Sequence, residues 1–213
     1  MLISPLKLTF LSVDGLMCIR GGRTVFRDVS FHVEAGQALS LEGPNGAGKT
    51  SLLRMIAGFL SPAAGTIRLQ MKNGEISDGE ERGRFVGWLG HSNAAKPQFS
   101  PRETLRFFVN LYRASGDIDA ALHKVGLGKV RDLPCQYLSA GQKKRLVLAR
   151  LMLTTRPLWL LDEPFAALDA DGKALAASLI AAHCKGGGIV LVATHEPLGV
   201  EGRRFSLATQ PTV

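Results

Sequence analysis

Residues 43–50 limit what this chain can fold into more than any other stretch, because they match the phosphate-binding pattern G-x-x-x-x-G-K-[ST]. Glycines allow successive backbone N–H groups to approach phosphate oxygens closely, and a lysine places a positive charge on the outer phosphates. A threonine hydroxyl after the lysine is a suitable ligand for Mg²⁺. We therefore expect a nucleotide triphosphate to be bound by Gly43, Pro44, Asn45, Gly46, Ala47, Gly48, Lys49, Thr50 and the following Ser51.

The residues on either side of this loop support the same interpretation. Residues 37–42 have the pattern of a short strand, and residues 51–57 that of a helix ended by Gly58. A strand, a glycine-rich loop and the N-terminus of a helix together form a site for an anion. The alternative is a glycine-rich turn that matches the pattern by chance, and the matching flanks disfavour it.

The length and composition predict one globular domain that can carry an inserted lobe. The chain has 213 residues, of which 46% are hydrophobic and 21% are charged, so it can bury a sizeable core. No run approaches the roughly 20 apolar residues that a membrane-spanning helix needs. The first residues also lack a basic region followed by an apolar run, so we expect no secretory signal and a chain that stays in the cytoplasm.

The net charge of +8 has two interpretations. It can indicate a nucleic acid or an anionic membrane surface as partner, or a solvated surface with some cations that serve a nucleotide. Lysines and arginines are dispersed, with small clusters at 143–145 and 203–204, and no aromatic residues alternate with them as in proteins that bind single strands. We therefore predict no nucleic-acid partner and keep attraction to anionic lipid as the second interpretation.

The first part of the chain is predicted to form mainly strands. Residues 6–34 hold three short alternating runs separated by glycines, which is typical of a small antiparallel sheet. Residues 65–69 predict another strand, and residues 86–89 predict a buried one. Between them, residues 72–84 are polar and are expected to be a connection on the surface.

After residue 91 the pattern changes to helices. Ser100 has the place of an N-cap, Pro101 that of the first helical residue and Glu103 that of the partner in a capping box. A second helix is predicted over residues 118–125. Three apolar residues follow the first cap at helical spacing and are expected in the core: Leu105, Phe108 and Leu111.

A third helix begins after Ser139, because Ser139 and Gln142 again have the spacing of a capping box. We interpret residues 92–152 as a helical lobe inserted between two strands of a nucleotide-binding core. That core would consist of residues 1–91 and 153–213.

The next apolar strand ends in two acids, Asp162 and Glu163. The carboxyl end of a buried parallel strand is the place where open α/β sheets bind ligands. Asp162 is expected to support Mg²⁺, directly or through water, and Glu163 to polarise an attacking water. Acids at a strand end are weak evidence alone, but much stronger after a phosphate loop. A helix over 170–184 and a strand over 188–193 follow, and then His195.

Five motifs in this order resemble those of the ATP-binding cassette (ABC) family. Leu-Ser-Ala-Gly-Gln at residues 138–142 is similar to the signature motif of that family, and the resemblance covers nearly the whole chain. Five motifs in the right order match by chance far less often than one motif does. They are residues 43–50, residues 138–142, Asp162 with Glu163, residues 166–169 and His195.

The resemblance implies an α/β fold, the P-loop ABC nucleotide-binding domain. Such a domain has a RecA-like core with a mixed sheet, an N-terminal antiparallel β subdomain and an inserted α-helical subdomain. The implied cofactors are ATP and Mg²⁺, and the implied activity is ATP hydrolysis coupled to transport. The implied partners are a second copy of the chain and integral membrane permease subunits, two of each, at the cytoplasmic face of the bacterial inner membrane.

The resemblance also implies roles for individual residues. Lys49 would bind the β- and γ-phosphates, Thr50 and Asp162 would hold the metal, Glu163 would be the catalytic base, and His195 would contact the γ-phosphate. A glycine lets backbone approach a phosphate, and a helix N-terminus aims its positive dipole at one. The residues implied to act across a dimer interface or in the loop that links the two sites are Ser139, Gly141, Gln142 and Asp169.

One departure from the family pattern concerns the metal. ABC proteins usually carry a glutamine after the strand placed here at 86–89, and it contacts Mg²⁺ or water. In this chain His91 or Ser92 occupies that position, and Gln98 is a weaker substitute. We expect His91 to be near the metal.

The other departure concerns adenine. ABC proteins usually stack adenine on an aromatic residue near residues 19–22, where this chain has none. Arg20 is expected to cover the ring through a cation–π contact. Phe26 is the second candidate.

A finer resemblance is to the ATP-binding subunits of bacterial cytochrome c maturation, the haem export type. It is carried by Gly-His at 90–91, by residues 138–145, by Trp-Leu-Leu-Asp-Glu-Pro-Phe at 159–165 and by residues 187–198. The alternatives are an ABC ATPase for another substrate, a soluble ABC ATPase that acts on nucleic acid or ribosomes, and a different phosphate-loop enzyme. The chain has a single cassette and no Asn-Lys-x-Asp guanine motif, which disfavours the last two.

Overall fold

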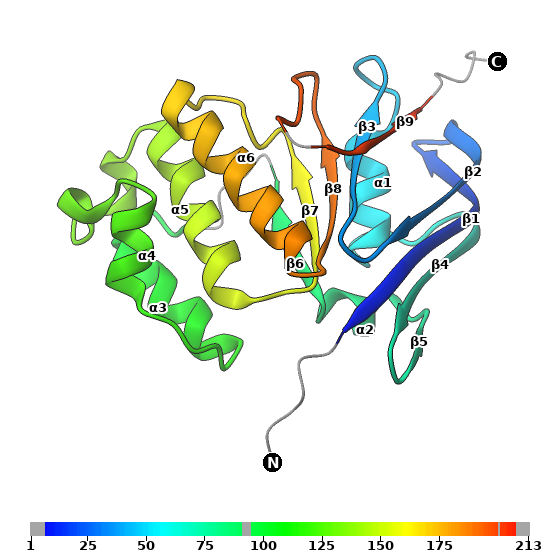
Figure 1. Ribbon diagram of the computed structural model, residues 1–213. Helices are drawn as coiled ribbons and strands as arrows, with labels where there is room; N and C mark the ends of the chain where they lie inside the picture. The colour runs from blue at the N-terminus through cyan, green and yellow to red at the C-terminus, as the bar shows by residue number, and fades with distance from the viewer. Residues whose placement is uncertain (1–6, 91–94, 200, 208–213) are drawn as a thin grey trace.

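A computed structural model describes residues 7–90, 95–199 and 201–207 of the chain (Figure 1). Its centre is a parallel sheet in which each neighbouring pair of strands runs in the same direction. The strand order is β6-β7-β8-β3-β9, so the chain crosses over repeatedly. These strands are β6 (Val86–Leu89), β7 (Leu158–Asp162), β8 (Ile189–Ala193), β3 (Ala38–Glu42) and β9 (Arg203–Ser206).

The N-terminal part forms a second, antiparallel sheet of order β2-β1-β4-β5, as predicted. Its strands are β1 (Leu8–Arg20), β2 (Arg23–Glu34), β4 (Ala64–Met71) and β5 (Gly74–Ile76). The expectation of three short runs was wrong in detail, because β1 continues through Gly15 instead of ending there. Gly15 has φ +59° and lies at a register shift between Val13 and Leu16, so the glycine makes a bulge and not a turn.

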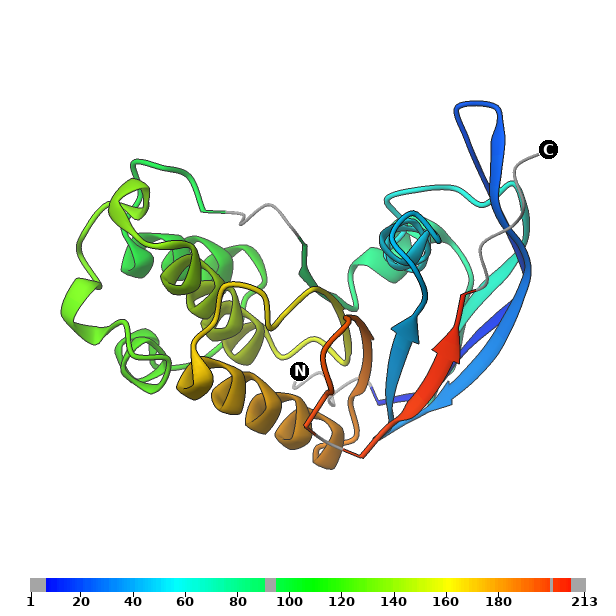
Figure 2. The same cartoon turned by 90° about the horizontal axis from the view of Figure 1, so that it is seen from above.

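The helix after the phosphate loop, α1 (Lys49–Ile56), lies between the two sheets (Figures 1 and 2). One core joins its Leu52 and Ile56 to Leu11 of the antiparallel sheet and to Leu41 and Leu160 of the parallel sheet. This packing determines where the N-terminus of α1 points, and therefore where the loop before it lies.

The opposite face of the parallel sheet is covered by α5 (Ala140–Thr154) and α6 (Ala170–Lys185). Alternate residues of β7 divide between the faces, as expected for a strand buried on both sides. Leu160 packs towards α1, whereas Trp159 and Leu161 pack towards α5 and α6.

Three helices form a group at one side of the molecule: α3 (Pro101–Leu111), α4 (Ile118–Lys124) and α5 (Figure 1). The capping boxes predicted at Ser100 and Ser139 are both present. Leu105 is fully buried in the core of this group, but Leu111 is 57% exposed, so the expectation that it belongs to the core was wrong. It is the last residue of α3. The proposed boundaries of the helical lobe, residues 92–152, stay a prediction.

The prediction of a surface connection over residues 72–84 is confirmed for most of the segment, which is largely exposed, but it missed two short elements and a buried arginine. That segment holds β5 and the short helix α2 (Gly79–Gly83), and Arg82 is 5% exposed. The Arg82 guanidinium donates to the carbonyl groups of Met55 and Ile56 in the last turn of α1, where carbonyl groups have no partner within the helix. A polar residue is therefore buried here because it satisfies the end of a buried helix.

The edge strand β9 was not predicted. Its sequence, Arg-Arg-Phe-Ser, is polar. The strand lies at the edge of the sheet, pairs only with β3 among the described strands, and leaves three of its four residues exposed to solvent. Within the described residues, no helix is both long enough and apolar enough to cross a membrane.

Candidate functional site

The phosphate loop joins the end of β3 to the start of α1, as the sequence predicts. Gly48 has φ +98°, and a Cβ there would lie 2.7 Å from side-chain atoms of both Val25 and Phe26. Gly43 has φ +143°, and a Cβ there would lie 2.6 Å from the carbonyl oxygen of Leu207. At these two positions glycine is required by the backbone conformation and also by the close approach of other residues.

Lys49 holds the loop in its curved form. Its Nζ donates to the carbonyl oxygens of Gly43, at 2.6 Å, and Pro44, at 3.1 Å. The same nitrogen lies 3.4 Å from Nε2 of His195, which is also 3.1 Å from Oδ1 of Asn45. The structure thus brings His195 to a loop that is about 150 residues earlier in the sequence.

Two oxygen groups suited to a metal lie side by side at the start of α1. The hydroxyl of Thr50 donates a 3.0 Å hydrogen bond to Oδ2 of Asp162, which is 3% exposed at the end of β7. Mg²⁺ typically takes one or two oxygen ligands from a protein and completes its shell with phosphates and waters. A hydroxyl and a carboxylate facing the phosphate loop fit this requirement.

Glu163 follows Asp162 in an unusual backbone conformation. Its φ is +49°, and its N–H donates to the carbonyl of Ala193 at 2.8 Å. Its Oε1 lies 3.8 Å from Nε2 of His195. The carboxylate is therefore held beside the phosphate loop, with a histidine between the two.

These groups line one cavity of about 420 Å³. The structure brings most of the predicted site residues together in this cavity. Its lining consists of Arg20, Val25, Pro44, Asn45, Gly46, Ala47, Gly48, Lys49, Thr50, Ser51, Asp162, Glu163 and His195. Val25 was missed by the sequence analysis, because an aliphatic residue in a strand carries no signal of a site.

Five predicted residues among those described do not line this cavity: Gly43, which lines a neighbouring cavity, and Ser139, Gly141, Gln142 and Asp169. The Ser139 hydroxyl accepts from the N–H of Gln142, and the Gln142 side chain accepts from the N–H of Ser139, so both serve the start of α5. Gly141 packs so closely that a Cβ would lie 2.7 Å from the carbonyl oxygen of Ala167. Asp169 caps α6 and pairs with Arg145 at 2.5 Å.

The two departures from the family pattern have different outcomes. His91 and Ser92 lie outside the described residues, so the metal role of His91 stays a prediction. Phe26 is 1% exposed and packs against the phosphate loop, so it is not available to stack on adenine. Arg20 is exposed at the cavity, which leaves it as the candidate.

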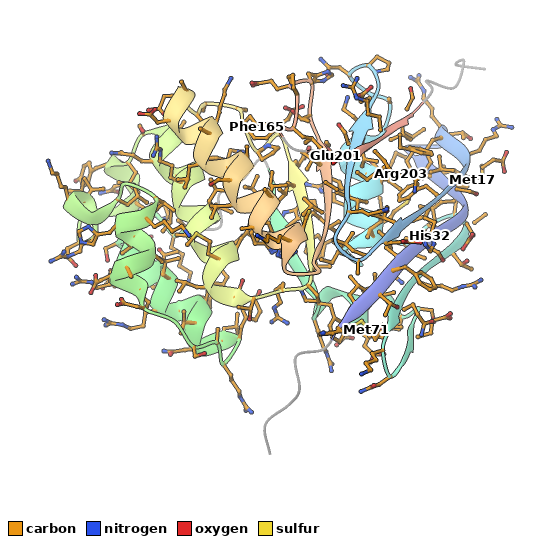
Figure 3. All side chains as sticks on the ribbon, in the orientation of Figure 1. Met17, His32, Met71, Phe165, Glu201 and Arg203 are labelled. Atoms are coloured by element: carbon orange, nitrogen blue, oxygen red, sulfur yellow. The ribbon has the colours of Figure 1, made fainter. Side chains whose placement is uncertain are left out.

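A second cavity, of about 590 Å³, lies on the other side of the loop after β8. Glu201 and Arg203, labelled in Figure 3, line it together with Gly43 and His195. Because His195 borders a cavity on both sides, polar contacts with Asn45 and Lys49 determine its position more than packing does.

Comparison with known families identifies this arrangement. Residues 26–166, about two thirds of the chain, match the family model described as "ABC transporter". The chain belongs to the ABC transporter family. It is accordingly an ATP-binding protein whose ATP hydrolysis is coupled to transport.

Curated relatives place this ABC transporter chain within the family more closely. It is 46% identical over 199 residues to the "Cytochrome c biogenesis ATP-binding export protein CcmA" of Rhodopseudomonas palustris (strain BisB5), covering 93% of this chain and 98% of the relative. It is 48% identical over 189 residues to the protein of the same name from Mesorhizobium japonicum, covering 88% and 92%. This ABC chain belongs with that group of export proteins.

Solved structures confirm the predicted fold class. A putative ABC transporter ATP-binding protein from Pyrococcus furiosus superposes with a TM-score of 0.78 at 25% identity, covering 93% of this chain and 98% of that one. A bacterial Atm1-family ABC exporter with ATP bound has a TM-score of 0.81 at 20% identity, covering 98% of this chain and 39% of the exporter. The latter likeness concerns the fold alone.

The close packing at Gly48 leads to a testable prediction for this ABC domain without nucleotide. Gly48→Ala is expected to lower the free energy of unfolding by about 3 kcal/mol, from the left-handed backbone and from the collision with Val25 and Phe26. Gly46→Ala is the matched control, because Gly46 has φ +85° but open space around it, so a loss of only about 1 kcal/mol is expected. Urea unfolding measures both, and equal losses would contradict the packing argument.

Proposed function

We propose that the chain is the ATP-hydrolysing subunit of a cytochrome c biogenesis export complex, and that the residues that line the cavity at the phosphate loop carry out the hydrolysis. The observation that carries the proposal is the convergence of Lys49, Asp162, Glu163 and His195 on that cavity. The identity of about 46% to export proteins of this name, over nearly their whole length, supports the assignment of the complex.

The proposed mechanism begins with the nucleotide. Phosphate oxygens would replace the carbonyl groups that Lys49 contacts in the structure, and the N–H groups of the loop would surround them. Arg20 would cover the adenine. Mg²⁺, when bound, would be held by Thr50 and Asp162 and would neutralise charge on the phosphates.

Hydrolysis would then depend on two side chains. Glu163 would accept a proton from the attacking water, and His195 would donate a hydrogen bond to the γ-phosphate. The 3.8 Å separation between these side chains supports their acting at one phosphate. The Glu163 carboxylate has His195 as its described charged neighbour and would orient the water between that histidine and the γ-phosphate.

The site of one chain is proposed to be completed by a second copy. Ser139, Gly141 and Gln142 lie outside the cavity but at the N-terminus of α5, whose dipole attracts a phosphate. In a two-fold homodimer each α5 N-terminus would face the ATP held by the other chain. Asp169 would lie between the two sites.

The homodimer would join two integral membrane permease subunits at the cytoplasmic face of the bacterial inner membrane, with no nucleic-acid partner. The helical residues 92–152 are the proposed inserted lobe, and residues 1–91 and 153–213 the core.

The assignment to cytochrome c biogenesis is tested in the cell that encodes the chain. Loss of the chain is expected to abolish covalently haem-stained c-type cytochromes, and the chain is expected to co-purify with an integral membrane protein. Normal c-type cytochromes would favour an ABC ATPase for another substrate. Co-purification with RNA or DNA and without a membrane protein would favour a soluble ABC ATPase.

The role of Glu163 is tested by Glu163→Gln, which removes the proton acceptor and keeps the shape of the side chain. We expect ATP turnover to fall by about 100-fold or more, with ATP affinity changed less than about twofold. Glu201→Gln is the matched control, since Glu201 lies on the neighbouring loop and does not line the nucleotide cavity. Equal turnover of Glu163→Gln and wild type would rule out Glu163 as the base.

The shared site is tested by Ser139→Arg, whose side chain would block a phosphate at the start of α5. We expect Ser139→Arg to bind ATP but to lose hydrolysis. The control is Ser178→Arg, on the exposed side of α6, which is expected to retain both ATP binding and hydrolysis. Hydrolysis at the wild-type rate by Ser139→Arg would contradict a shared site.

A further inference from the structure

Lys144 is a buried cation in the first half of α5. It is 6% exposed, and its Nζ donates a hydrogen bond of 3.0 Å to the main-chain oxygen of Glu163. Lysine is rarely buried without a specific partner. Lys144 therefore contacts the turn that carries the proposed base, without lining the nucleotide cavity itself.

The turn at Glu163 depends on such contacts. A left-handed backbone costs a residue other than glycine about 1–2 kcal/mol, and Glu163 has φ +49°. Three hydrogen bonds hold it there: its N–H donates to the carbonyl of Ala193, and its own carbonyl accepts from Lys144 at 3.0 Å and from the N–H of Ala166 at 3.4 Å. Because both ends of the residue are held, the direction of its Cα–Cβ bond is determined as well.

Charge acts in the same direction as this hydrogen bond. Burial lowers the pKa of Lys144 below its usual range, and the carboxylates of Asp162 and Glu163 offset only part of this lowering. The two acids thus favour the charged form of the lysine that supports their own turn.

The same helix carries the segment proposed to contact the ATP of the other chain, residues 138–142. Gly141 packs against the carbonyl of Ala167, and Arg145 pairs with Asp169. The first half of α5 therefore contacts residues 163–169, which join β7 to α6, at three points, and Lys144 supplies the contact nearest to the nucleotide cavity.

From this arrangement we infer that Lys144 is a positioning residue for Glu163, and that it makes the direction of Glu163 depend on the position of segment 138–142. The inference rests on the proposed role of Glu163. Contact of segment 138–142 with the nucleotide of the other chain orients α5, and α5 orients Glu163 through Lys144. Each chain then becomes competent for hydrolysis when its own α5 is engaged in the other site.

The test begins with Lys144→Met, which removes the charge and the donor but nearly keeps the length of the side chain. We expect kcat to fall roughly 10- to 100-fold, since a small displacement of a catalytic group has this effect. KM for ATP and the affinity for a fluorescent ATP analogue are expected to change less than about twofold. Lys144→Arg, which keeps a donor, is expected to restore part of kcat.

The matched control is Lys129→Met, which removes one positive charge from an exposed position in the same group of helices. It is expected to leave kcat unchanged. If it lowers kcat as much as Lys144→Met does, the effect is one of net charge and the inference is overturned.

A double variant separates an effect through Glu163 from general damage. Lys144→Met is compared with its parent in single-turnover hydrolysis, first in wild type and then in Glu163→Gln. A residue that acts through Glu163 has little further effect once the base is gone, so the second ratio is expected to be close to one. An equal loss in both backgrounds would overturn the inference, as would wild-type kcat in Lys144→Met.

Unfolding midpoints show first whether the variants are folded. If Lys144→Met is unfolded, the comparison is made with Lys144→Gln, which retains an N–H donor and is expected to lower kcat less. Failure of the proposed function would be recognised separately, because wild type and Glu163→Gln would then hydrolyse ATP at the same rate.

Discussion

The burial of α1 between two sheets is the constraint on which the rest of this structure depends. The helix has eight residues, too few to be stable alone in water, so its position comes from packing. Leu52, Leu53 and Ile56 are fully buried, and Arg82 satisfies carbonyl groups at the far end. The antiparallel sheet carries none of the proposed hydrolytic residues, yet it contributes directly because it fixes the helix whose N-terminus is proposed to receive the phosphates, and its Arg20 and Val25 line the cavity.

The chemical groups reach this helix from the carboxyl ends of three parallel strands. The loop follows β3, Asp162 and Glu163 end β7, and His195 follows β8. Since all three strands run in the same direction, their ends meet at one edge, and residues more than 100 positions apart come within hydrogen-bonding distance. Few of these contacts are apolar, so the site is organised mainly by charge and hydrogen bonds on a rigid apolar support.

Helix α5 links this support to the helical group. Leu148 and Leu151 pack with the sheet, whereas Leu146 and Ala149 pack with α3 and α4. A helix shared by two cores moves with both, which makes it a suitable carrier for a signal between its N-terminus and the turn at Glu163. The same position explains why its N-terminal residues lie outside the cavity of their own chain.

The sequence by itself determined the local features of this protein. Capping residues such as Ser100 and Ser139, the glycine pattern of the phosphate loop and the acids after β7 act through neighbouring residues, so their meaning can be recognised without the fold. The bulge at Gly15, the burial of Arg82, the exposure of Leu111 and the strand β9 could not be predicted, because each depends on what a distant segment covers. Only the tertiary structure decided that Phe26 closes the phosphate loop and that Lys144 reaches Glu163, since contacts between residues far apart in the chain arise from packing and leave no periodic pattern in the sequence.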